Sequence, residues 1–243
     1  MSIASRNTDP TSLYQHIDSG QPSPSMEDIA NYNNNAFLSV VSEFEPLEPN
    51  FPGRPEETPP HFHVTEESVL KKLSALNPSK DTGPDGVPAW LLQENADLFS
   101  RPIADIMNKS FQESKLPQSW KDADIVPIPK QKPIHNVNKH LRRISLTPVL
   151  SKIAEDYIVE YIKPAVLAKV DEYQFGTVPK SSTTLALISM VHSWLSGTDG
   201  NGGTVHAVLF DFRKAFNLID HRILVNKLST YGLPNSLVSI IGS

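Results

Sequence analysis

The sequence predicts an α+β protein that is mostly helical and has few strands. After Thr65, apolar residues recur at three- and four-residue spacing through most of the chain, which is typical of amphipathic helices. Strand-like patterns are confined to two short segments, 120–130 and 204–210. The first 60 residues are instead rich in proline, serine, asparagine and acidic residues. These observations indicate a largely disordered N-terminal linker, residues 1–60, followed by one domain, residues 61–243.

The linker is predicted from its composition. It contains two cations, Arg6 and Arg54, and nine acidic residues. A segment of this composition buries too little apolar surface on folding to offset the loss of chain entropy. Only residues 26–44 have an amphipathic pattern, with Ile29 and Phe37 in its apolar set, so this piece can form a helix. Prolines recur after it too often for a helix or central strand, at Pro46, Pro49, Pro52, Pro55, Pro59 and Pro60.

The helices of the domain are predicted from capping residues and apolar spacing. Thr65 can cap a helix that has two glutamates in its first turn. Thr147 and Pro148 form a good N-cap and first-turn pair for the next long helix. Asp220 can cap the last helix, which is expected to end at Gly232 and to pack Ile223, Leu224 and Leu228. Further helices are expected around 90–92 and over 103–114 and 182–195.

The strands differ in their expected burial. Pro127 and Pro129 make residues 120–130 an edge strand or a hairpin arm, because proline cannot donate to a sheet ladder. Residues 132–143 are predicted to be an exposed basic loop. Residues 204–210 are almost wholly apolar and are predicted to form a buried strand.

Composition narrows the class of protein. The 243 residues contain no cysteine, which excludes disulfides, cysteine-ligated zinc and thiol catalysis. No apolar run approaches the roughly 20 residues that span a bilayer, and the N-terminus lacks the apolar core of a signal peptide. We therefore expect an intracellular protein, in the nucleus or cytoplasm, without membrane contact. The net charge of −5 is concentrated in the linker, so it does not exclude a nucleic-acid partner for the domain.

Asp211 is the leading candidate for chemistry. It ends the apolar segment 204–210, and a buried strand that delivers a carboxylate can hold a divalent metal ion for phosphoryl transfer. The alternative is a helix-capping or surface aspartate, which is commoner on position alone. A phosphatase with an aspartate nucleophile is disfavoured, because that class needs a second acid two residues later and position 213 is arginine.

Other candidates also have ordinary explanations. Phe216 can wall a nucleotide sugar, or it can be a core phenylalanine. Arg142 and Arg143 can grip phosphates through planar, bidentate guanidinium groups, with Lys130, Lys132 and Lys139 adding charge, or they can lie in a solvated basic loop. His61 and His63 are the only closely spaced histidines, and a proline-rich surrounding makes them a poor metal site.

Five segments appear together in a specific order, and their combination is more informative than any one of them. The series resembles the reverse transcriptases of non-LTR (LINE-type) retrotransposons, over about residues 65–243. The segments are KDTGPDGVP (80–88), WKDADIVPIPK (120–130), LRRISLTP (141–148), QFGTVPKSST (174–183) and LFDFRKAF (209–216).

The resemblance implies a fold and an activity. The fold would be an incomplete right-hand polymerase, made of the fingers, the first palm strand and the following helix. The activity would be RNA-directed DNA synthesis, with an RNA template, a DNA primer, deoxynucleoside triphosphates and Mg²⁺.

The resemblance also implies residue roles. Asp211 matches the first metal-binding, catalytic aspartate, and Phe212 the residue whose backbone carbonyl helps to hold metal. Phe216 matches the aromatic residue that packs against the deoxyribose and excludes a 2′-hydroxyl. Arg142 matches the arginine that binds the incoming triphosphate, with Lys130 on the preceding strand. Nucleic-acid contacts are expected from Gln174, Lys139 and Arg143.

Three departures from the family pattern stand out. Arg143 replaces the usual proline after the triphosphate-binding arginine, and Asn217 replaces the usual aspartate after Phe216. The paired-aspartate block that follows in the family does not occur within the 243 residues. Because two-metal transfer needs several carboxylates, we expect this chain by itself not to polymerise. The alternatives are a non-catalytic remnant that binds RNA or template–primer duplex, and a decayed fragment without function.

Overall fold

The computed structural model describes residues 25–39, 44, 47, 62–131, 134, 136–200, 203–212 and 218–242. Over these residues the protein is mostly helical with one two-stranded sheet, as the sequence predicts. The elements are α2 (Met26–Leu38), α3 (Glu66–Ser74), α4 (Ala89–Glu94), α5 (Ala96–Gln112), the 3-10 turn η1 (Gln118–Trp120), β1 (Asp124–Pro129), α6 (Val137–His140), β2 (Leu141–Leu146), α7 (Val149–Leu167), α8 (Thr183–Thr198), α9 (His221–Ser229) and α10 (Asn235–Gly242).

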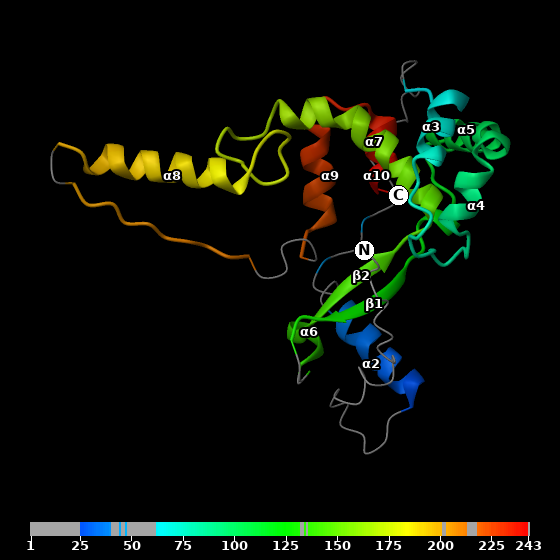
Figure 1. Ribbon diagram of the computed structural model, residues 1–243, viewed down its shortest axis with the longest axis horizontal. Helices are drawn as coiled ribbons and strands as arrows, with labels where there is room; N and C mark the ends of the chain where they lie inside the picture. Colours follow the sequence, from blue (N-terminus) through cyan, green and yellow to red (C-terminus); the bar gives the residue numbers. More distant parts are fainter. Residues whose placement is uncertain are drawn as a thin grey trace, which may run out of the picture.

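Helices α3, α4, α5, α7 and α10 enclose the main core. The predicted caps at their boundaries hold in part: the Thr65 side chain accepts from Ser68 N at the start of α3, but α7 begins after Pro148 and no side chain caps it. The fully buried side chains include Leu73, Met107, Phe111 and Leu237, from three helices distant in the sequence. Figure 1 shows these helices gathered at one end of the molecule.

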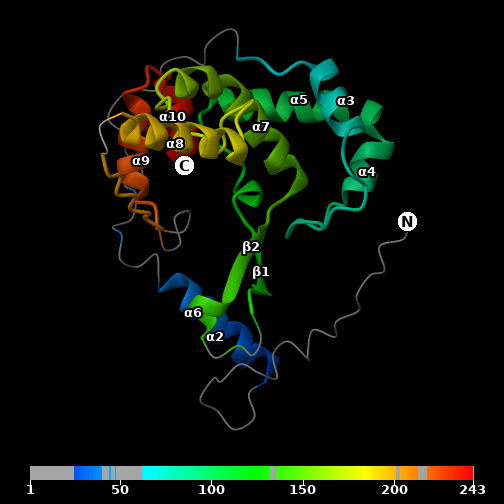
Figure 2. The ribbon, with the colours of Figure 1, turned by 60° about the vertical axis from the view of Figure 1, so that its left-hand side comes forward.

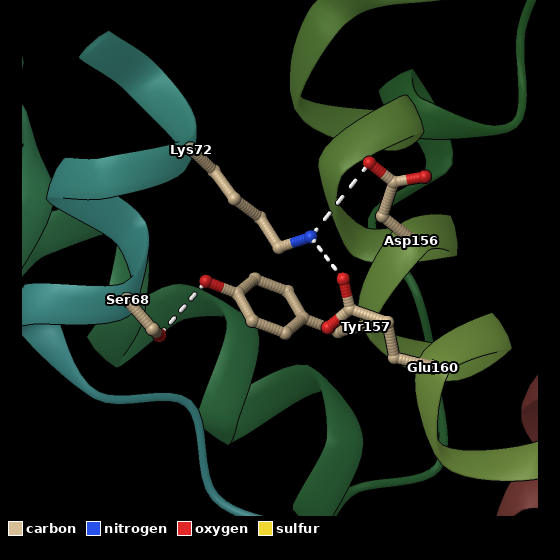
Figure 3. Close-up of polar contacts among 5 residues, drawn as sticks. All are labelled: Ser68, Lys72, Asp156, Tyr157 and Glu160. Atoms are coloured by element: carbon tan, nitrogen blue, oxygen red, sulfur yellow. Dashed lines mark hydrogen bonds and ion pairs between the residues drawn. The ribbon is translucent and has the colours of Figure 1, made fainter. Parts of the chain in front are cut away.

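Polar contacts join α3 to α7 across this core. Lys72 Nζ lies 2.7 Å from Glu160 Oε1 and 3.8 Å from Asp156 Oδ2. The same ammonium lies 4.8 Å from the centre of the Tyr157 ring, and the Tyr157 hydroxyl is 2.9 Å from Ser68 Oγ. Figure 3 shows these side chains meeting between the two helices.

Helix α10 lies beyond the end of the predicted last helix. Gly232, with a φ of 71°, follows α9 as expected, but the chain turns there into α10. The Asp220 carboxylate caps α9 through Arg222 N and Ile223 N, as predicted. The packing face of α9 was predicted in part: Leu228 is buried, whereas Ile223 is 66% exposed and Leu224 is exposed, because Val225 and Leu228 form the face that meets α10.

Strands β1 and β2 form an antiparallel hairpin. Lys130 N donates to His140 O at 2.7 Å. Hydrogen-bonded residues alternate along an antiparallel strand, so Ile128 and Val126 are the residues of β1 whose backbone groups bond to β2. Pro127 and Pro129 therefore lie at positions that need no donor, and the predicted hairpin arm is confirmed. The prediction of an exposed basic loop over residues 132–143 was wrong. That stretch contains α6 and the start of β2, because Ile134, Val137 and Leu141 bury their side chains in a small core.

Helix α2 supplies the other side of that small core. Ile29 and Phe37 are buried against Ile134, Val137 and Leu141, so the amphipathic piece predicted within 26–44 is a packed helix. Figures 1 and 2 show α2 and α6 together at the end of the hairpin farthest from the helical core. Helix α2 is thereby attached to the hairpin.

Residues 203–212 form no strand, contrary to the prediction for 204–210. They are extended, and Val208, Leu209 and Phe210 are 72%, 88% and 85% exposed. A strand needs a neighbour for its backbone groups, and no described strand pairs with this segment. Helix α8 precedes it and, although the helix itself was predicted correctly, it buries none of its residues. Figure 1 shows α8 extending away from the core, with the segment running back beneath it.

Candidate functional site

The hairpin brings two of the predicted site residues onto one face. In an antiparallel pair, directly opposed residues lie on the same face of the sheet. Arg142 is opposite Ile128, and Lys130 follows two residues after Ile128, so both cations lie on this face. Val126 and Ile144, another opposed pair, lie there as well. We call this set, Val126, Ile128, Lys130, Arg142 and Ile144, the outer face.

The outer face is open to solvent. Its apolar residues Val126, Ile128 and Ile144 are 38%, 42% and 43% exposed, and both cations are exposed. Within the described part of the chain, no ion pair or hydrogen bond occupies the side chain of Lys130 or Arg142. A guanidinium and an ammonium beside an apolar strip can bind a ligand that has phosphate oxygens at one end and an apolar body at the other.

Arg143 lies on the opposite, inner face of the hairpin. Its Nη1 donates to Phe37 O of α2 at 2.7 Å, and its guanidinium lies 4.9 Å from the centre of the Phe37 ring. Burial lowers the pKa of the Arg143 guanidinium from its usual value. Arg143 is thus engaged within the protein and does not share the face of Arg142. Phe37 was predicted only as part of an amphipathic helix, and no local sequence signal indicates its partner.

Two further predicted contact residues lie outside the strands of the hairpin. Lys139 is exposed in α6, where its backbone N–H bonds the Asn136 side chain 3.0 Å away. Gln174 lies in the loop between α7 and α8, and its Nε2 donates to Gly176 O at 3.0 Å. Both side chains are exposed, so the structure leaves them accessible to a partner.

Asp211 belongs to the exposed segment 203–212. This segment runs apart from the hairpin in both views of the chain (Figures 1 and 2). Phe212 is 81% exposed, and Phe216 falls outside the described residues. Among the residues that the structure describes, no group of three or more His, Cys, Asp or Glu side chains comes together as a metal site. Asp211 offers an oxygen ligand of the type that Mg²⁺ prefers, but one exposed carboxylate does not make a two-metal site.

Comparison with known proteins identifies the region that contains β2 and Asp211. Residues 128–242 match the family described as "Reverse transcriptase (RNA-dependent DNA polymerase)". This region is similar to the reverse transcriptase family. The matched range contains all the site residues predicted above, from Lys130 to Phe216, while α2 to α5 precede it.

A transposon protein is similar to a longer part of the chain. The "Transposon TX1 uncharacterized 149 kDa protein" of Xenopus laevis is 23% identical over 185 residues, which is 76% of this chain. The chain spans 14% of the length of that relative. Together the two matches confirm the resemblance to the reverse transcriptases of non-LTR retrotransposons.

None of the described helices is both long and apolar enough to cross a bilayer.

Proposed function

We propose that residues 61–243 form the fingers and the start of the palm of an RNA-directed DNA polymerase of a non-LTR retrotransposon. The family match over residues 128–242 supports the reaction class, and the transposon relative supports the source. In this proposal residues 1–60 are a linker that contributes helix α2 to the fingers.

The outer face is the proposed site of nucleotide binding. Arg142 and Lys130 lie on the same exposed face of a hairpin whose second strand matches the family. The guanidinium binds two phosphate oxygens of the incoming deoxynucleoside triphosphate, and the ammonium of Lys130 adds a second positive charge. The apolar strip of Val126, Ile128 and Ile144 excludes water from one side of the bound phosphates, which strengthens these contacts.

The remaining roles follow the resemblance. Asp211 and the Phe212 carbonyl oxygen contribute to a Mg²⁺ site, and Phe216 contacts the sugar. Gln174 and Lys139 contact template or primer. Mg²⁺, when bound, would neutralise charge on the triphosphate and activate the primer hydroxyl. Arg143, which binds Phe37 on the other face, is left out of the nucleic-acid contacts.

Triphosphate binding by the 243-residue chain tests the proposal. Arg142→Ala should weaken the binding of a deoxynucleoside triphosphate about tenfold or more, as expected for the loss of hydrogen bonds to a charged group. Arg101→Ala is the matched control, because it removes an exposed guanidinium from α5 and leaves the hairpin intact. Equal affinity of the Arg142→Ala and Arg101→Ala variants would overturn the assignment of the outer face.

Primer extension tests the expected lack of activity in isolation. Residues 1–243 contain no paired-aspartate block, so this polypeptide alone should not extend a DNA primer on an RNA template. Extension that is lost on Asp211→Ala would contradict that expectation. Salt-sensitive RNA binding without triphosphate binding would favour the alternative of a non-catalytic, RNA-binding remnant.

A further inference from the structure

The cation at the C-terminal end of α2 is Arg143, which belongs to a strand far along the sequence. The last four carbonyl groups of a helix have no partner inside it, and cations are favourable at this end. The last turn of α2 contains no basic residue. Arg143, 106 positions along the chain from Phe37, donates to the Phe37 carbonyl at 2.7 Å and stacks 4.9 Å from its ring centre.

We propose that Arg143 is a positioning residue that fastens α2 across the inner face of the hairpin and thereby fixes the outer face on which Arg142 lies. The inference rests on the proposed function only for the role of Arg142. The contact between Arg143 and Phe37 stands independently of it.

Helix α2 depends on this contact. A 13-residue helix is marginal in water by itself, and α2 buries only Ile29, Asn33 and Phe37. Asn33 Oδ1 is buried without a hydrogen-bond partner, which works against docking. A cavity of about 320 Å³ lies between α2 and β1, and it is lined by residues of α2 from Met26 to Phe37 together with Ile125 and Pro127. The apolar contact between α2 and β1 is therefore incomplete, and the hydrogen bond from Arg143 to the Phe37 carbonyl adds to it.

The hairpin depends on α2 in turn. A two-stranded sheet is marginal in water unless one of its faces packs against another element. On the inner face, Leu141 is buried with Ile29 and Phe37 of α2, and Arg143 lies two residues further along the same strand. The outer face has exposed apolar side chains and no described helix over it. Loss of α2 would leave both faces of the hairpin solvated, and the direction of Arg142 would no longer be fixed.

The geometry of β2 offers a variant that removes the contact and keeps the hairpin. Arg143 is opposite Pro127, which cannot donate, and the bonded positions of the ladder run through Ile128 and Lys130. A proline at position 143 therefore costs no hydrogen bond to β1, and it favours extended backbone at Arg142. Arg143→Lys is a milder change that keeps the charge and loses the planar, stacking guanidinium.

Two measurements on the 243-residue chain test the proposal. The first is amide hydrogen exchange in α2, which should become at least about tenfold faster in Arg143→Pro, less so in Arg143→Lys, and unchanged in Arg101→Ala. Protection in α5 is the folding control and should not change. The second is the affinity for a deoxynucleoside triphosphate, which should fall several-fold in Arg143→Pro although Arg143 does not touch the ligand.

The outcomes separate the inference from the proposed function. Unchanged exchange in α2 for Arg143→Pro would overturn the fastening contact. Faster exchange with unchanged triphosphate affinity would overturn the positioning role. If Arg142→Ala itself leaves the affinity unchanged, the nucleotide site and the positioning role both fail, while the exchange result still decides whether Arg143 fastens α2.

Discussion

Gly83 lies directly against Pro148, where β2 passes into α7. A Cβ atom placed on Gly83 would lie 2.5 Å from Pro148 N and 2.7 Å from Pro148 Cα. Such distances leave no room for a side chain, and the contacting atoms are backbone. The contact joins two of the five segments that resemble the family: segment 80–88 and the end of segment 141–148. Loop 80–88 therefore supports the base of the strand that carries Arg142.

Gly83→Ala should destabilise the protein by about 1–3 kcal/mol, because the added methyl group forces two backbone segments apart. The measurement is the urea midpoint of unfolding at constant m-value. Gly176→Ala is the control: its Cβ would meet only Gln174 Nε2 at 3.5 Å, an ordinary contact. Similar losses in both variants would contradict the close approach of Gly83 to Pro148.

Features that depend on neighbouring residues were predictable from the sequence. The caps at Thr65 and Asp220 form as expected, because each bonds a backbone group two or three residues away. The hairpin arm was predictable because Pro127 and Pro129 restrict where the ladder can bond. In the site, the sequence identified Lys130 and Arg142 as candidates, and strand alternation accounts for their common face.

Features that depend on distant partners were not predictable. Arg143 and Phe37 are 106 positions apart, and Lys72 and Glu160 are 88 apart. No periodicity links such residues. The apolar pattern of 204–210 indicates that these side chains favour burial. Burial also needs a neighbouring element against which the segment can pack and with which its backbone can bond. Helix α10 was missed because a short apolar run does not distinguish helix from strand.

The Lys72–Glu160 pair should contribute little to stability and should respond to salt. The side chains of Lys72 and Glu160 are 21% and 64% exposed, and exposed pairs typically contribute about 0.2–1 kcal/mol. A double-mutant cycle with Lys72→Met and Glu160→Gln should give a coupling energy in that range, falling as salt is raised. Lys71→Met, on the exposed side of α3, is the control and should show no coupling to Glu160→Gln. A coupling that is insensitive to salt would show that the pair is better shielded than its exposure indicates.

Tyr157 should make stability fall at high pH. Burial is the main cause that raises the pKa of Tyr157 above its model-compound value of 10.0, partly offset by the hydrogen bond with Ser68 and the charge of Lys72. Because the folded-state pKa is the higher one, the contribution is fully present below pH 10 and is lost as pH rises through the folded value. The stability advantage of wild type over Tyr157→Phe should therefore be constant near neutral pH and shrink above pH 10. An advantage that grows with pH in that range would contradict the raised pKa.

The exposed segment that ends at Asp211 gives the sharpest contrast between sequence pattern and structure. Leu209 is 88% exposed, whereas Leu237 of α10 is fully buried in the main core. Leu209→Ser should change the free energy of unfolding by no more than about 0.5 kcal/mol. The same chemical change at Leu237 should cost at least about 2–5 kcal/mol, because it opens a cavity and buries a hydroxyl group. Leu209→Ser should also reduce self-association, since exposed apolar segments promote it. Denaturant unfolding and sedimentation of both variants measure the two effects. A loss at Leu209 equal to that at Leu237 would show that the segment packs as a buried strand, as its apolar pattern predicts.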